Sequence, residues 1–155
     1  MGLAWDIFGS GKTARDGGAG AKSIAAQIAK TEAELAASSH ADAQAMAKRL
    51  KAAREAFVEV VDFIAANTKA NPNAAFAGSV PYLMLTGNLV AGWQMGRALL
   101  VALTPEAQAQ DAAFMAAKVT TARFYADHIL SKVPGIRDGI VEGAGSVTAL
   151  PLEAF

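Results

Sequence analysis

Apolar residues recur at alternating spacings of four and three in the second quarter of the chain. They are Met46, Leu50, Ala53, Phe57, Val60 and Ile64. This spacing puts about one side chain per helical turn on a single face, which lets the helix pack along a neighbour at a shallow angle. Ser39 and Asp42 resemble a capping box upstream, and Asn71-Pro72-Asn73 interrupts the pattern downstream. We therefore predict a helix that starts near Ser39 and ends at Asn71, with a loop after it.

Residues 80–103 form a nearly continuous apolar run that is long enough to cross a bilayer. The polar side chains Asn88, Gln94 and Arg97 all fall inside it. An arginine well within a membrane span costs about 3 kcal/mol on insertion scales. We therefore favour a central helix of a soluble bundle over a transmembrane helix. In such a helix Gly92 and Gly96 would let a neighbouring backbone come close, and Trp93 would fill space beside them.

Residues 21–37 and the segment after residue 103 are also expected to be helical. The first consists of good helix formers. Its apolar residues close to one face are Ile24, Ile28 and Leu35. The second begins with Thr104-Pro105-Glu106, which supplies an N-cap, a proline at the first helical position and an acid in the first turn. We expect this long helix to run to about Lys132 and to stop at Pro134-Gly135, with only short pieces after it.

The fold class follows from these segments and their connections. The helices are joined by short connectors, and no alternating stretch rich in valine and isoleucine predicts a strand. Residues 1–20 are dense in glycine and contain the turn signal Asp16-Gly17-Gly18, so we assign them to an entry segment or linker. We predict an all-α fold, in which residues 21–155 form one antiparallel bundle of about four main helices with short C-terminal helical pieces.

Composition narrows the classes of function. The 14 basic and 14 acidic residues cancel, so we expect no nucleic-acid partner. The absence of cysteine excludes disulfides, thiolate nucleophiles and thiolate metal sites. Residues 1–11 lack the basic and apolar regions of a secretory signal, so we expect a cytoplasmic protein. Hydrophobic residues make up 53% of the chain, and the mean hydropathy is +0.26, which indicates apolar surface for a protein partner.

Two glycine-rich stretches invite a nucleotide-binding interpretation that fails. Gly9-Ser10-Gly11-Lys12-Thr13 resembles the end of a P-loop, but that motif requires glycine where Asp6 stands and a buried strand upstream. Gly18-Ala19-Gly20 opens no dinucleotide-binding fingerprint, because Ser23 occupies the third glycine position. We interpret both stretches as linker or turn sequence.

The histidines and the charged residues do not predict a catalytic centre either. His40 lies beside a helix start and His128 near a helix end, and neither belongs to a pair with metal-ligand spacing. We expect both to be structural or solvated, and we predict no catalytic, cofactor-binding or metal-binding residue in this chain.

A cluster of basic residues is followed at once by acidic ones. The basic residues are Lys48, Arg49, Lys51 and Arg54, and the acidic ones are Glu55, Glu59 and Asp62. We favour a solvated helix face, on which such pairs contribute little. The alternative is that these charges meet a complementary surface elsewhere and orient a partner.

Three stretches resemble the C-terminal domain of certain bacterial acyl-CoA dehydrogenases. They are residues 81–98 (PYLMLTGNLVAGWQMGRA), residues 116–128 (AAKVTTARFYADH) and the ending at residues 146–155 (SVTALPLEAF). The subgroup includes the 3-methylmercaptopropionyl-CoA dehydrogenases, which append an extra helical domain to the catalytic core. Residues 4–9 (AWDIFG) with Lys12 and residues 15–18 resemble, less closely, the stretch just after the catalytic glutamate of that subgroup.

The resemblance implies α,β-dehydrogenation of an acyl-CoA thioester by a full-length, FAD-dependent enzyme, in which a glutamate takes the α-proton and the flavin takes the β-hydride. The family's Tyr-Glu-Gly-Thr motif, which carries that glutamate, is absent here, so no catalytic residue is transferred. The chain is then a non-catalytic helical domain, inactive alone. Its implied partners are the catalytic core and further copies of itself, with no membrane.

The alternative is an independent helical interaction protein, such as a phasin-like coat on apolar granules.

Overall fold

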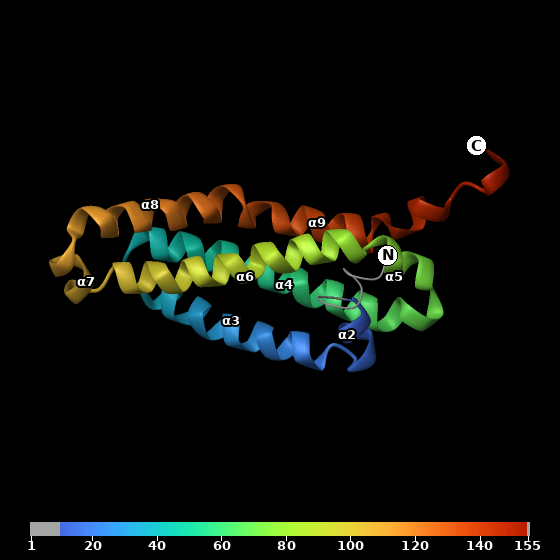
Figure 1. The fold of residues 1–155 in the computed structure, drawn as a ribbon, viewed down its shortest axis with the longest axis horizontal. Helices are drawn as coiled ribbons and strands as arrows, with labels where there is room; N and C mark the ends of the chain where they lie inside the picture. Colours follow the sequence, from blue (N-terminus) through green and yellow to red (C-terminus); the bar gives the residue numbers. More distant parts are fainter. Residues whose placement is uncertain (1–9, 155) are drawn as a thin grey trace.

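The computed structural model describes residues 10–154, and every regular element in this range is helical (Figure 1). The all-α prediction is therefore confirmed. The α-helices are α2 (Ser10–Arg15), α3 (Ala19–Ala37), α4 (Ala41–Ala70), α5 (Pro72–Ala77), α6 (Ser79–Ala102), α7 (Pro105–Gln110), α8 (Ala112–His128) and α9 (Val133–Val141). Short 3-10 helices follow α8 and α9: η1 (Leu130–Lys132), η2 (Gly143–Thr148) and η3 (Leu152–Ala154).

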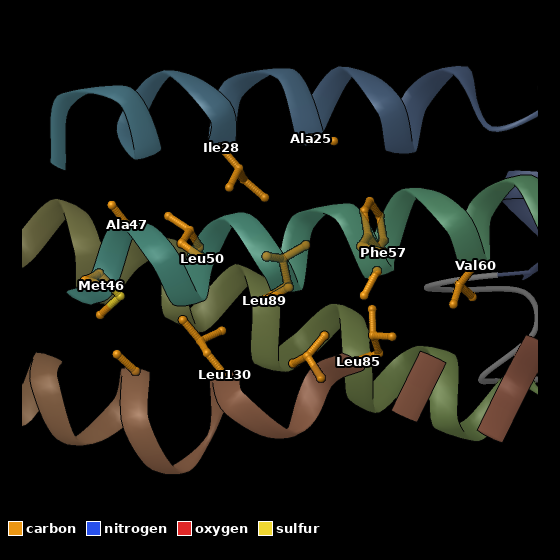
Figure 2. Packing of buried hydrophobic residues seen from close by; sticks show 14 of the residues in the cluster. Ala25, Ile28, Met46, Ala47, Leu50, Phe57, Val60, Leu85, Leu89 and Leu130 are labelled. Atoms are coloured by element: carbon orange, nitrogen blue, oxygen red, sulfur yellow. The ribbon is translucent and has the colours of Figure 1, made fainter. Parts of the chain in front are cut away.

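Helices α3, α4, α6 and the run from α8 to α9 lie side by side as an elongated bundle (Figure 1). Helix α4 is its centre, because it packs against α2, α3, α6, α8 and α9. The six residues of the four-and-three pattern are all buried, which confirms the predicted packing face of α4. Figure 2 shows Met46, Leu50, Phe57 and Val60 of this face in one cluster with Ile28 of α3, Leu85 and Leu89 of α6, and Leu130.

Helix α3 turns to the core the face on which Ile28 and Leu35 lie. Its buried residues are Ala25, Ile28, Thr31 and Leu35. Ile24 lies close to this face along the helix but remains 40% exposed. Thr31 is buried because its hydroxyl accepts a hydrogen bond from the Trp93 indole nitrogen, at 2.9 Å. That bond satisfies two polar groups between α3 and α6.

The N-cap of α4 is His40, not Ser39 as the capping-box pattern predicts. The His40 ring nitrogen Nδ1 accepts a hydrogen bond from the backbone amide of Asp42 at 3.3 Å. Ser38 supports this turn, because its hydroxyl accepts a bond from the His40 amide at 3.2 Å. A histidine nitrogen thus satisfies one of the amides that a helix start leaves without a partner.

Proline begins helices at two places where the pattern predicts an end. After α4 the chain forms the short helix α5 instead of a loop, with Asn71 as its N-cap and Pro72 in its first turn. Pro134 likewise lies in the first turn of α9 and does not stop the helical run. Both corrections have one cause: a proline at the start of a helix needs no amide partner and already has a helical φ angle.

The predicted helix from Thr104 to Lys132 is broken into pieces. Its start is confirmed, since the Thr104 hydroxyl accepts a bond from the Ala107 amide. The helix then ends at Gln110, and Asp111 caps a new helix, α8, by accepting a bond from the Phe114 amide at 2.9 Å. A second interruption follows His128, where η1 leads into α9.

Two glycines in the turn before α3 have left-handed backbone angles, with φ of 63° at Gly17 and 86° at Gly18. Gly18 is also tightly packed, because a Cβ there would lie 2.5 Å from Cγ1 of Val61 on α4. Asp16 closes the turn by accepting bonds from the amides of Gly18 and Gly20. This turn directs α3 along α4, so only glycine suits position 18. The exact boundary between entry segment and bundle stays a prediction.

Helix α6 is buried along one side only. Gly92 and Gly96 face inward, as predicted, but side chains and not a backbone fill the space that they leave. A Cβ on Gly92 would lie 2.6 Å from Leu130 Cδ2, and one on Gly96 would lie 3.0 Å from Leu35 Cδ1. None of the helices in the described range, α6 included, is long and apolar enough to cross a membrane.

Candidate docking face

The two histidines singled out in the sequence both make contacts within the bundle. His40 caps α4, and the His128 ring packs against the Phe124 ring with 4.5 Å between centroids. Within residues 10–154 there is no group of three or more histidine, aspartate or glutamate side chains that could hold a metal ion. The expectation that this chain carries no catalytic or cofactor-binding residue stays a prediction.

The P-loop-like stretch is only partly within the described residues, since Gly9 lies outside them. Residues 10–15 form α2, and the Thr13 hydroxyl lies 3.1 Å from the Tyr82 hydroxyl in a buried contact. Burial raises the pKa of Tyr82, and the bond to Thr13 partly offsets this effect. The hydroxyl that a P-loop would use on magnesium thus joins α2 to α6.

The charged residues of α4 pair mainly within the bundle. Arg54 Nε lies 2.8 Å from Oε2 of Glu32 on α3, and the two side chains are only 20% and 15% exposed. Lys51 pairs with Glu55 at 3.0 Å on the surface. Two acids reach other helices: Glu59 pairs with Arg137 at 3.2 Å and Asp62 with Lys22 at 2.7 Å. The solvated-face interpretation is therefore wrong for Arg54, which links α4 to α3.

A second ionic network fixes the N-terminal end of α4 to α8. Arg123 on α8 lies between two carboxylates, with Nη1 2.9 Å from Asp42 Oδ1 and Nε 2.6 Å from Asp127 Oδ2. The bond from Arg123 lowers the pKa of Asp127. Asp42, in the first turn of α4, thus has two roles. Its carboxylate interacts favourably with the positive end of the α4 dipole, and it binds Arg123 of α8.

An open hollow of about 520 Å³ lies between α3 and α6. Its polar lining includes Glu34, Gln94 and Arg97. Arg97 is already engaged, because its guanidinium lies 5.8 Å from the Trp93 ring centroid and donates to Gln94 Oε1 at 2.9 Å. One arginine facing a carboxylate creates no strongly charged site.

The outward side of α6 carries several exposed apolar residues. We call it the outer α6 seam: Val80, Met84, Gly87, Ala91, Gln94, Ala98 and Val101. Val80, Met84 and Val101 are 62%, 56% and 61% exposed. Helix α8 packs beside α6, where the Tyr125 hydroxyl donates to the backbone oxygen of Asn88, and it adds exposed Phe114 and Phe124. These exposed apolar residues make this side of α6 a candidate docking face.

The fold defines an elongated helical domain, and the comparisons with known proteins give its family. Residues 22–151 match the family model described as acetyl-CoA dehydrogenase C-terminal like. The chain therefore belongs to the family of C-terminal acyl-CoA dehydrogenase domains, which confirms the resemblance seen in the sequence.

One relative is similar over almost the whole chain. The 3-methylmercaptopropionyl-CoA dehydrogenase of Ruegeria pomeroyi is 42% identical over 147 residues, which are 95% of this chain. The chain spans 25% of that relative's length. No solved structure matches the chain.

Sequence reasoning missed the outer α6 seam as a site. The apolar run at residues 80–103 predicts a buried helix, yet the helix has an exposed side. The signal that could have found it is the absence of a polar stripe, because a helix at a bundle surface ordinarily carries one.

Proposed function

We propose that this chain is a non-catalytic helical domain that docks on the catalytic part of a FAD-dependent acyl-CoA dehydrogenase and serves its assembly. The enzyme as a whole would remove hydrogen from the α and β carbons of an acyl-CoA thioester in the cytoplasm. The similarity over 95% of the chain to a quarter of a dehydrogenase carries this proposal. The exposed apolar residues of α6 and α8 support it, because a domain without a partner gains nothing from them.

The flavin and the catalytic glutamate are proposed to lie outside this chain. The hollow between α3 and α6 does not fit FAD, because Glu34 would repel the diphosphate and no aromatic side chain lines it to stack on the flavin ring. Arg97 is held over Trp93 and bonded to Gln94 instead of standing free. No step of the reaction is therefore assigned to residues of this chain.

Co-purification tests the proposal. The 155-residue chain would carry an affinity tag and be co-expressed with an acyl-CoA dehydrogenase catalytic part of the Ruegeria pomeroyi type. We expect both to elute together in equal amounts, with flavin absorbance and acyl-CoA oxidation only in fractions that contain the catalytic part. Tight FAD binding by the chain alone, or failure of the two to associate, would contradict the proposal.

A flotation assay distinguishes the proposed function from a granule-coat function. A phasin-like protein would bind phospholipid-coated apolar particles in a flotation assay, with its amphipathic helices opening onto the particle. The partly buried ion pair between α3 and α4 and the hydrogen bond between α3 and α6 favour a fixed bundle over such opening. We expect the chain to stay in the soluble fraction.

A further inference from the structure

Acidic residues are absent from a long stretch of the chain that includes all of α6. No aspartate or glutamate lies between Asp62 and Glu106, and Arg97 is the single charged residue of α6. In α8 the one carboxylate is that of Asp127, whose Oδ2 lies 2.6 Å from Arg123 Nε. The two helices therefore present no free carboxylate, and their charges leave a positive excess.

The acids of the bundle are concentrated on its other two long helices, α3 and α4. These acids are Glu32, Glu34, Asp42, Glu55, Glu59 and Asp62. Helices α3 and α8 each pack against both α4 and α6, so the side shared by α3 and α4 lies opposite the side shared by α6 and α8. Five of the six large exposed apolar side chains on these four helices belong to α6 and α8. The exposed apolar residues are thus on the side that lacks free acids.

Phe114 and Lys118 extend the outer α6 seam onto α8. Phe114 precedes Tyr125 by about three helical turns, so the two side chains lie on the same side of α8. The Tyr125 hydroxyl donates to the backbone oxygen of Asn88, which places this side of α8 beside α6. The Lys118 ammonium lies 4.8 Å from the Phe114 ring centroid, so a positive charge stands next to the exposed ring.

Arg97 is held in position at the edge of the seam that faces α3. Its guanidinium lies 5.8 Å from the Trp93 ring centroid, and Nη1 donates to Oε1 of Gln94 in the seam at 2.9 Å. That is the one hydrogen bond that Arg97 makes within the described residues, and a guanidinium carries several more N–H donors. A carboxylate can accept a pair of these bonds, and the contact with Trp93 reduces the side-chain entropy that such binding costs.

The composition of this side is that of a protein interface. Methionine, phenylalanine and arginine are enriched at the centre of protein–protein interfaces, whereas aspartate and glutamate are depleted there. Met84, Phe114 and Phe124 are exposed here, and Arg97 lies at the edge of the same surface. Because Arg97 and Lys118 have no acid to balance them on their own helices, the complementary partner is one that brings carboxylates.

We propose that the outer α6 seam and the adjoining side of α8 bind an amphipathic helix of the dehydrogenase catalytic part, with carboxylates along both edges of its apolar stripe. The seam positions alternate in steps of four and three from Val80 to Val101, which suits a second helix at a shallow crossing angle. One carboxylate pairs with Arg97 and another with Lys118. This docking mode rests on the proposed function and adds the surface used and the charge of the partner.

Isothermal titration calorimetry with the flavin-loaded catalytic part of the Ruegeria pomeroyi type tests the charge of the partner. Arg97→Glu is expected to raise the Kd about tenfold. Raising the salt concentration from about 0.1 M to about 0.5 M should weaken wild-type binding severalfold and the variant much less. Lys48→Glu is the matched control, because Lys48 is exposed and lines a hollow between α3 and α4 on the opposite side. The control should bind like the wild type, and circular dichroism should show that both variants remain helical.

Glu34 allows a test in the opposite direction. Glu34 lines the hollow between α3 and α6 together with Arg97, so it would repel a partner carboxylate bound at Arg97. Glu34→Gln should therefore lower the Kd about two- to threefold. The matched control Glu55→Gln, on the exposed part of α4, should leave the Kd unchanged. A gain in affinity has the further advantage that damage to the fold does not produce it, and weaker binding by Glu34→Gln would contradict the proposal.

The outcomes separate this docking mode from the proposed function and from other occupants. A wild-type chain that does not bind the catalytic part at either salt concentration overturns both. Binding that is insensitive to salt and equal in Arg97→Glu and Lys48→Glu overturns the acidic partner helix alone. Two further results overturn it while binding to the catalytic part persists. Loss in Arg97→Glu of flotation with phosphatidylserine vesicles would assign the surface to anionic lipid, and loss of a doubled sedimentation mass would assign it to a second copy.

Discussion

The hydroxyl of Thr13 lies 3.1 Å from the hydroxyl of Tyr82, in a buried contact between residues 69 positions apart. Thr13 belongs to the short helix α2 and Tyr82 to the inner side of α6, where its ring also stacks on Phe57 of α4 at 6.0 Å between centroids. The contact therefore ties the first described element to the start of α6 and to the core beside α4.

Tyr82→Phe is expected to lower the free energy of unfolding by about 1–2 kcal/mol, because the Thr13 hydroxyl would stay buried without a partner. Urea denaturation followed by circular dichroism measures this loss. Tyr125→Phe is the matched control, since that hydroxyl donates to a backbone oxygen at 3.2 Å from a half-buried position. The free energy of unfolding should fall less in the control. An equal loss would show that the buried contact adds no more stability than the half-buried one.

The same tyrosine makes the bundle sensitive to alkali. Burial raises the pKa of Tyr82 above its ordinary value of 10.0, so above that pH the unfolded chain loses the proton first. The contribution of protonated Tyr82 to the free energy of unfolding is complete below pH 10.0. It is lost as the pH rises through the pKa of Tyr82 in the folded state. Urea midpoints between about pH 8 and pH 11 should fall above pH 10. Tyr82→Phe should fall less steeply, and an identical decline would exclude this cause.

Two alanine substitutions in α6 are expected to act in opposite directions. Gly92→Ala should lower the free energy of unfolding by about 1–3 kcal/mol, because the new methyl group would collide with the Leu130 side chain. Gly87→Ala should raise it by about 0.5–1 kcal/mol, because the space is open and alanine favours the helix. Thermal unfolding of the two variants measures both effects, and destabilisation by Gly87→Ala would show that the position has a role inside the chain.

The pair of Arg54 and Glu32 should contribute more than a surface ion pair. A double-mutant cycle with alanine at each position is expected to give a coupling energy of about 1 kcal/mol, since both side chains are largely buried between α3 and α4. The exposed pair Lys51 and Glu55 is the reference and should give about 0.3–0.5 kcal/mol. Equal coupling in the two cycles would show that burial adds nothing here.

Periodicity predicts the long helices well, because each position on a buried face needs an apolar residue. The face from Met46 to Ile64 is the clearest case. Sequence patterns fail where one residue type has two uses. Pro72 and Pro134 begin helices, although proline after a helix ordinarily indicates an end. His40 caps α4 although the neighbouring serine is the more common capping residue.

The candidate docking face could not be located from sequence for a different reason. Gly87, Gly92 and Gly96 lie in one apolar run, and only the packing of Leu130 and Leu35 distinguishes the two inward glycines from the outward one. A helix that is apolar on all sides carries no mark of which side meets solvent. The family resemblance, by contrast, was visible in residues 81–98 and 116–128, because side chains packed in a bundle constrain many positions at once.

The central position of α4 also governs how long the fold persists. Helices α2, α3, α6, α8 and α9 all cover it, so the peptide hydrogens near Leu50 and Phe57 reach water only when several covering helices separate together. These hydrogens should therefore be the last in the protein to exchange for deuterium. The lifetime of this one helix is then the lifetime of the whole bundle.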